Sequence, residues 1–127
     1  MSEIFSKDNA LVGDITGWLF VPELDRHVPV LRAFINPATT GNREVVAAQV
    51  GKKIRVISAF VMATIANTIH FRSANSAISM TAPLGANGGF VLVHNPHGWF
   101  ETAIGDALNT NMSVATATGV QVTYIVI

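Results

Sequence analysis

Hydrophobic and polar residues alternate along much of this chain, and short turn sequences separate the alternating segments. Between Thr68 and Arg72, for example, Ile69 and Phe71 fall on one parity and His70 on the other, which is typical of a strand with one buried face. Such segments recur about every 8 to 12 residues, as they do in sandwiches and jelly rolls. The expected strands are 28–35, 44–50, 54–63, 68–72, 77–82, 90–94, 107–114 and 120–127. We therefore predict an all-β fold, an antiparallel β-sandwich or jelly roll.

The segment from Ile54 to Ala63 is apolar on both parities for most of its length. A central strand that is covered on both faces of its sheet has this pattern. A buried helix is the alternative, because periodicity alone does not separate the two for a short apolar run. The β-branched residues Ile54, Val56 and Ile57 favour the strand, which we expect to form a hairpin with the strand 68–72.

The first 27 residues show no clean period. Gly13 and Gly17 interrupt any helix, and Pro22 ends the apolar cluster that precedes it. We expect residues 1–27 to form an extended arm and residues 28–127 the sandwich domain; the alternative for the arm is an ordinary first strand of the same sheet. An arm of this kind cannot build its own core, so its apolar side chains must pack on the domain, on a sister subunit or on a larger partner. Those side chains are Ile4, Phe5, Trp18, Leu19, Phe20 and Val21.

A long loop is expected from Asn95 to Asn111. Pro96 fixes φ and Gly98 tolerates positive φ, so the loop opens with a turn, and the neighbouring aromatics Trp99 and Phe100 follow it. We expect this aromatic pair to anchor the loop on the sheet.

The charges are few and unevenly placed. Of the 16 Asp, Glu, Lys and Arg residues, 13 lie between Glu3 and Arg55, and the formal net charge is zero. A neutral chain has no long-range field to attract nucleic acid or an anionic membrane. The weakly charged carboxy-terminal half suits permanent subunit contact, because interface cores are depleted of charge. A Thr- and Asn-rich monomer is the alternative.

Targeting and redox features are equally sparse. Cysteine is absent, which excludes a disulfide scaffold and a thiolate site. The amino terminus lacks the basic and apolar regions of a signal peptide. The most apolar run, Ala59 to Ala66, is far shorter than the roughly 20 residues of a membrane-spanning helix.

Candidate chemistry is weak. His94 and His97 lie three residues apart, but no third metal ligand is close in sequence, and zinc sites normally take three or four protein ligands. Glu101 and Asp106 form a possible carboxylate pair, for which capping of the loop is the simpler interpretation. The serines lack a nucleophile-elbow context, and the glycine-rich segment 85–89 lacks the lysine of a phosphate loop. We predict no catalytic residue, no metal and no cofactor, and hence no enzyme.

Several short motifs in order give the chain a resemblance to a known class of proteins. The motifs are Gly51-Lys-Lys-Ile-Arg-Val, His70-Phe-Arg-Ser-Ala, the glycine loop 85–89, Asn95-Pro-His-Gly-Trp-Phe-Glu-Thr, Gly105-Asp-Ala-Leu-Asn-Thr-Asn-Met-Ser and Gly119-Val-Gln-Val-Thr-Tyr. Together they cover about residues 44–127, and the chain here resembles small β-sandwich or jelly-roll structural proteins of tailed bacteriophage virions. The arm lies outside the resemblance.

The resemblance implies a homotrimer that binds the major capsid protein or another virion protein, as a head-decoration (cement) protein, a head fibre or a tail component. It places the chain in the virion, assembled in the host cytoplasm. From the charge and hydropathy above, we expect neither nucleic acid nor a membrane as partner. The arm would dock on the shell. The expected subunit-interface or loop-anchor residues are Trp99, Phe100, Tyr124, Ile125 and Ile127. A carbohydrate- or host-surface-binding module with Trp99 as its sugar platform is the rival function.

Overall fold

The computed structural model describes residues 17–127 of the chain. The chain divides into two compact units, Met1–Leu31 and Arg32–Ile127. The boundary lies four residues after the one expected from the sequence. The predicted arm residues Ile4 and Phe5 fall outside the described residues.

In the amino-terminal unit, β1 (Trp18–Val21) and β2 (Arg26–Pro29) form an antiparallel hairpin. The turn between them is closed by a hydrogen bond from Leu24 N to Val21 O of 3.0 Å. The expected arm is therefore a two-stranded sheet of its own from residue 18 to 29, and β1 pairs with no strand of the sandwich. The prediction of one strand over 28–35 was wrong, because this segment is divided between β2 and β3 (Leu31–Ile35). At the break, the backbone N–H of Val30 donates a hydrogen bond to Gly17 O.

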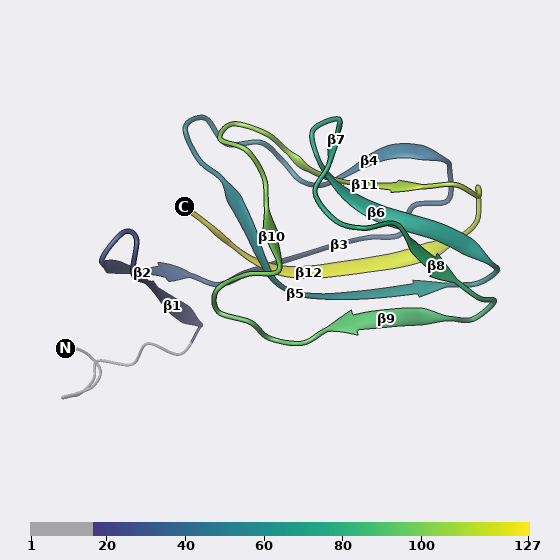
Figure 1. Ribbon diagram of the computed structural model, residues 1–127, viewed down its shortest axis with the longest axis horizontal. Coiled ribbons are helices and arrows are strands. Elements are labelled where there is room, and N and C mark those ends of the chain that lie inside the picture. The colour runs from purple at the N-terminus through teal and green to yellow at the C-terminus, as the bar shows by residue number, and fades with distance from the viewer. Residues whose placement is uncertain (1–16) are drawn as a thin grey trace. The chain divides into compact units, whose positions relative to one another are not determined.

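The carboxy-terminal unit consists of two five-stranded sheets whose described pairs are antiparallel. The first sheet, in the order β10-β5-β12-β3 with β9 also paired to β5, contains β3, β5 (Ile54–Ala63), β9 (Gly89–Leu92), β10 (Phe100–Glu101) and β12 (Thr118–Val126). The second sheet, in the order β4-β11-β6-β7 with β8 also paired to β6, contains β4 (Gly41–Val46), β6 (Asn67–Ser73), β7 (Ser76–Ala77), β8 (Ala82–Leu84) and β11 (Leu108–Met112). Figure 1 shows β5, β12 and β9 in one layer and β4, β11 and β6 in the other. The predicted all-β class and antiparallel sandwich are confirmed.

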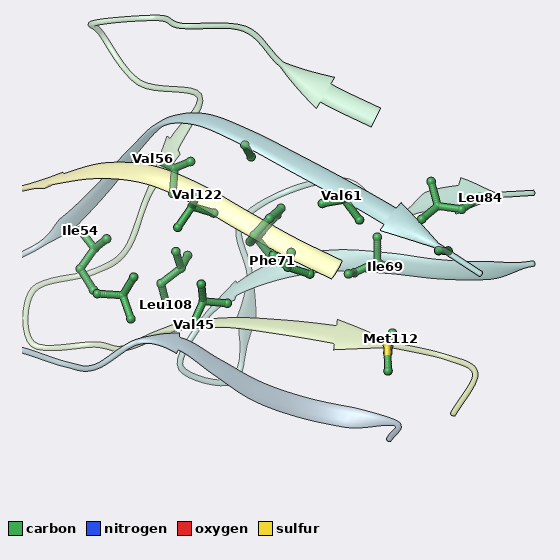
Figure 2. Packing of buried hydrophobic residues seen from close by; sticks show 14 residues of the cluster. Val45, Ile54, Val56, Val61, Ile69, Phe71, Leu84, Leu108, Met112 and Val122 are labelled. Atoms are coloured by element: carbon green, nitrogen blue, oxygen red, sulfur yellow. The ribbon is translucent and has the colours of Figure 1, made fainter. Parts of the chain in front are cut away.

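The core lies between the two sheets. Alternate residues of β5 and β12 face alternate residues of β6 and β11, as Figure 2 shows. The fully buried side chains of this unit include Val56, Val61, Ile69, Phe71, Leu108, Val120, Val122 and Ile125. The alternation predicted for 68–72 is confirmed, since Ile69 and Phe71 are buried and His70 is not.

The expected strand 77–82 is interrupted. β7 ends at Ala77 and β8 begins only at Ala82. Between them the Ser79 hydroxyl accepts a hydrogen bond from Phe71 N at 2.9 Å. A side-chain oxygen thus takes the place of a backbone carbonyl as the acceptor for this N–H of β6. A polar side chain that hydrogen-bonds to nearby backbone groups competes in this way with the regular hydrogen-bond ladder between strands.

The central position predicted for 54–63 is confirmed, because β5 lies between β12 on one side and β9 with β10 on the other. Its expected cover on both faces is wrong for the single chain. Phe60 and Met62 are 47% and 42% exposed, since the second sheet covers only the inner face of β5.

Candidate interaction surfaces

The outer face of the first sheet carries a group of exposed hydrophobic side chains. Phe60 lies opposite Val91 of β9 and opposite Gln121 of β12, and residues directly opposite each other in an antiparallel pair share a face. We call this group the apolar face and define it as Phe34, Phe60, Met62, Val91 and Val93. Their exposed fractions run from 42% at Met62 to 71% at Phe34. Such a contiguous exposed apolar group is uncommon on a protein that works alone.

Two hollows lie on either side of Phe60. One, of about 210 Å³, lies between Phe34 and Phe60 and extends over Gly119. The other, of about 230 Å³, lies between Phe60 and the strand end at Val91 and Val93. No Asp, Glu, Lys or Arg lines either hollow, and His94 lines the second. The apolar face is therefore uneven and weakly charged, with Phe60 as its central ridge.

The outer face of the second sheet is different. We call it the polar face and define it by Asn42, Thr68, His70, Arg72, Asn109 and Asn111. These side chains bond one another and their neighbours: Asn111 donates to Asn42 Oδ1 at 2.8 Å, Thr68 donates to Ser113 Oγ at 2.7 Å, and Arg72 Nε donates to His70 Nε2 at 2.8 Å. Burial, and then the nearby Arg72 charge, lower the pKa of His70.

The hairpin of the amino-terminal unit presents an aromatic side. Trp18 and Phe20 point to one side of β1, with exposed fractions of 51% and 46%, and the Phe20 ring contacts the His27 ring edge-on at 5.3 Å. Leu19 is half-buried and Val21 is buried. Of the four described arm residues in the prediction, Trp18 and Phe20 therefore offer the most surface to a partner.

The loop after Asn95 is built on β5. Trp99 N donates to Val56 O at 2.8 Å, and Gly98, at φ +85°, comes so close to Arg55 that a Cβ would lie 2.5 Å from its Cγ. Phe100 points inward and packs on Phe71 with ring centroids 5.0 Å apart, as an anchor would. The Trp99 indole donates to Val93 O at 2.7 Å and stays 44% exposed.

An apolar cleft of about 480 Å³ opens where the edges of the two sheets meet. It is lined mainly by Ile78, Met80, Pro83, Phe90, Leu92, Trp99 and Phe100, with Phe71 also among its residues. Its one hydroxyl, on Ser79, already bonds Phe71 N and Met80 O, so the cleft offers little polar chemistry to a substrate.

The two carboxylates of the loop belong to separate networks. Glu101 accepts hydrogen bonds from Lys53 at 2.8 Å and Arg55 at 2.9 Å, which join β10 to β5. Burial alone would raise the pKa of Glu101, but these two bonds and the two positive charges outweigh it and lower that pKa. Asp106 instead accepts from the Ser73 hydroxyl at 2.8 Å, and Ser73 Oγ in turn accepts from Ala103 N. Both carboxylates thus hold the loop.

The remaining predicted candidates lie as follows. The Ile125 side chain is fully buried and has no surface to offer a neighbouring subunit. Tyr124 is half-buried against the core, and the half-buried Ile127 exchanges backbone bonds with Lys53. Between residues 17 and 127 no cluster of three or more His, Asp or Glu could hold a metal ion, and the same range contains no helix able to span a membrane.

The apolar face was missed from the sequence. Its signal was present in the both-parity hydrophobicity of 54–63 and in the run Phe90–Val93. The pattern of 54–63 predicted cover on both faces, but in the single chain Phe60 and Met62 on the outer face stay exposed.

Comparisons with known proteins add little. No protein-family description matches the chain, and no curated protein sequence matches it. Among solved structures, the capsular polysaccharide assembling protein CapF from Staphylococcus aureus is similar over 77% of this chain at 12% identity, with a TM-score of 0.31. The chain spans about a quarter (24%) of the length of CapF.

Proposed function

We propose that this chain is a structural protein of a bacteriophage virion, a trimeric decoration protein that binds and stabilises the capsid shell. The observation that carries the proposal is the apolar face. Phe60 and Met62 stand on the outer side of a central strand and are nearly half exposed. A permanent protein contact would remove that apolar surface from water.

The rest of the sandwich supports a structural role. The inner faces of the two sheets form one packed core, and the Asn95 loop is held by Phe100, Glu101 and Asp106. The result is a rigid body, which is what a protein that bridges neighbouring shell subunits requires.

The hairpin supplies a second surface in this proposal. Trp18 and Phe20 are exposed aromatics among the described residues of the amino-terminal unit, and aromatic side chains are enriched among the residues that dominate interface energy. We assign them to the contact with the shell, so that the body can assemble with its copies while the hairpin docks.

Binding to shells tests this function. The purified chain is mixed with expanded capsid shells that lack a decoration protein, and the shells are sedimented and then challenged with heat or low salt. Saturable binding that raises shell resistance is expected. Trp18→Ala combined with Phe20→Ala should reduce occupancy, whereas Leu24→Ala, in the turn of the same hairpin, should not. A chain that fails to bind shells contradicts the decoration role and shifts the proposal to a tail or fibre component.

Carbohydrate binding is the second candidate, favoured by Trp99. Its ring is 44% exposed and held by the hydrogen bond to Val93 O, so it would present a fixed apolar platform to a sugar. A glycan array separates the two functions: loss of glycan binding in Trp99→Ala, with shell binding unchanged, would establish the second one.

A further inference from the structure

β9 lies at an edge of the first sheet, and Figure 1 shows it at the border of its layer. It pairs with β5 and with no second strand among residues 17–127. An edge strand presents backbone N–H and C=O groups to which a further strand can bond, and proteins protect such edges with charged side chains, with proline or by keeping the strand very short.

The other edges of the two sheets carry this protection. Their strands contain a charged residue or a proline: Arg32 on β3, Arg43 on β4, Pro83 on β8 and Glu101 on β10. The remaining edge strand, β7, has only two residues. β9, with the sequence Gly-Phe-Val-Leu, has neither charge nor proline. It is therefore the edge best suited to accept another strand.

The register shows which backbone groups of β9 face this edge. Ala63 N donates to Gly88 O at 2.8 Å, and hydrogen-bonded pairs alternate with non-bonded pairs along an antiparallel ladder. Phe90 and Leu92 therefore bond β5, whereas the N–H and C=O groups of Val91 point away from β5 toward the edge.

A donor within the chain already uses the same edge. Val93 has the parity of Val91, and its carbonyl oxygen accepts a hydrogen bond from the Trp99 indole at 2.7 Å. This bond agrees with the register, and it shows that a donor can approach the edge one pair further along.

The apolar cleft of about 480 Å³ lies beside this edge, where Phe90 and Leu92 line it together with Pro83 of β8. Side chains directly opposite each other in a strand pair share a face. In a strand added to β9, one residue would bond Val91 through its main chain. The residues before and after it would point with Phe90 and Leu92 into the cleft.

The lining of the cleft selects the side chains that it can receive. No Asp, Glu, Lys or Arg of residues 17–127 lines it, and the Ser79 hydroxyl already bonds Phe71 N and Met80 O. A charged side chain would lose its water there without gaining a partner, whereas an aliphatic or aromatic one would be removed from water.

We infer that β9 accepts an extended segment of a partner protein as an additional strand, with uncharged apolar side chains at alternate positions seated in the apolar cleft. In such strand addition the main-chain hydrogen bonds give affinity and the pocket gives specificity. A small apolar molecule could fill the cleft but would leave the outward groups of Val91 to water. The inference goes beyond the proposed function and does not depend on it, because neither the trimer nor the shell enters the argument.

Peptide binding to the full chain tests the inference. The probes are short, capped, fluorescently labelled peptides with Val, Leu or Phe at alternate positions and Thr between them, and binding is followed by fluorescence anisotropy. At least one probe should bind saturably. N-methylation of its central Thr, which removes the donor to Val91 O, should weaken binding about fivefold or more. N-methylation of a neighbouring apolar residue, whose N–H faces away from β9, is the matched control and should have a smaller effect.

Variants of the protein give a second readout. Val91→Pro removes the outward N–H without removing a bond to β5, and proline is tolerated on an edge strand in this position. Met80→Asp places a charge in the cleft lining at a side chain that is 80% exposed. Each should weaken binding of the probe about fivefold or more. Ile104→Asp, at a side chain that is 64% exposed and outside the cleft, should bind as the natural chain does. Far-ultraviolet circular dichroism should be the same for all three variants.

Three results would overturn the inference. The first is that no probe binds. The second is equal binding of the two N-methylated peptides, which would mean that the cleft takes side chains without main-chain pairing. The third is self-association of the natural chain that both Val91→Pro and Met80→Asp prevent, which would make a second copy the occupant. Binding to capsid shells is measured separately, so failure of the decoration role leaves the peptide result standing, and the reverse holds as well.

Discussion

The two outer faces of this sandwich have the same backbone geometry but carry different side chains. On the polar face, Asn111 of β11 bonds Asn42 of β4, and Arg72 bonds His70 along β6. On the apolar face, the equivalent outward positions of β5 and β9 carry Phe60 and Val91. A side-chain network of amides and an imidazole is stable in contact with water. Exposed phenyl and isopropyl groups stabilise the protein only when another surface removes them from water.

Under the proposed trimer, the apolar pattern of β5 on both parities describes an assembled molecule. A strand that is apolar on both parities needs two covers, and the second sheet supplies one. The polar face has a strict alternation, and a single chain satisfies it completely.

The largest expected effect lies where the two sheets share their core. Phe71→Ala removes a side chain that is 1% exposed and packs on Phe100, so it should lower the free energy of unfolding by about 3–5 kcal/mol. Phe34→Ala on the apolar face should lower it by less than about 0.5 kcal/mol in the monomer. Urea denaturation at a concentration below that of assembly measures both. Equal losses would mean that Phe34 is buried within the single chain.

A smaller effect is expected on the polar face. Asn111→Ala leaves the side-chain oxygen Oδ1 of Asn42 without its 2.8 Å donor, and loss of one partly buried hydrogen bond costs about 0.5–1.5 kcal/mol. The variant should unfold earlier at every protein concentration. Val91→Ala should instead unfold earlier only at concentrations where copies associate, because binding to the folded state stabilises it. A concentration-independent loss for Val91→Ala would contradict the contrast between the faces.

Much of this fold could be predicted from the sequence, because alternation dictates it locally. The strict period of 68–72 located β6, and the β-branched run from Ile54 located β5. The break between β7 and β8 could not be predicted, since it depends on the Ser79 hydroxyl meeting Phe71 N across the sheet. Neither could the hairpin of residues 18–29, where the apolar spacing shows no period.

The candidate surfaces were only partly predictable for the same reason. Trp18 and Trp99 stand out by residue type, but Ile125 does not reveal from sequence which face of β12 it occupies. Residue 57 of β5 has no partner at the irregularity between Thr123 and Tyr124, and a one-residue shift of register moves the side chains that follow to the other face. The shift lies on β5, where Ile54 and Val56 as well as Ala59 and Val61 face the core. Ile125, expected at a subunit interface, lies opposite Arg55 and is fully buried.

Acid should weaken the charged end of the first sheet by a modest amount. Because the pKa of Glu101 is lowered in the folded chain, its stabilising contribution is complete above the ordinary value of 4.5 and is lost as the pH falls below 4.5 through the folded pKa. Glu101 is about one-third exposed, so the loss should be under about 1 kcal/mol. Glu101→Gln should remove this part of the pH dependence between pH 5 and 3 in urea titrations; an unchanged dependence would mean that other carboxylates carry it.

The smallest effect concerns His70 on the polar face. Its Nε2 accepts the hydrogen bond from Arg72 Nε at 2.8 Å, which requires that nitrogen to be unprotonated. Burial and the Arg72 charge lower the pKa of His70 below 6.5, so the folded chain binds the proton less readily than the unfolded chain does. Its contribution to stability is therefore complete above pH 6.5 and declines as the pH falls through the folded pKa. An NMR titration of the His70 ring should show a midpoint below 6.5 that rises in Arg72→Gln, whereas a midpoint at or above 6.5 in the natural chain would mean that the Arg72 bond does not hold His70 neutral in solution.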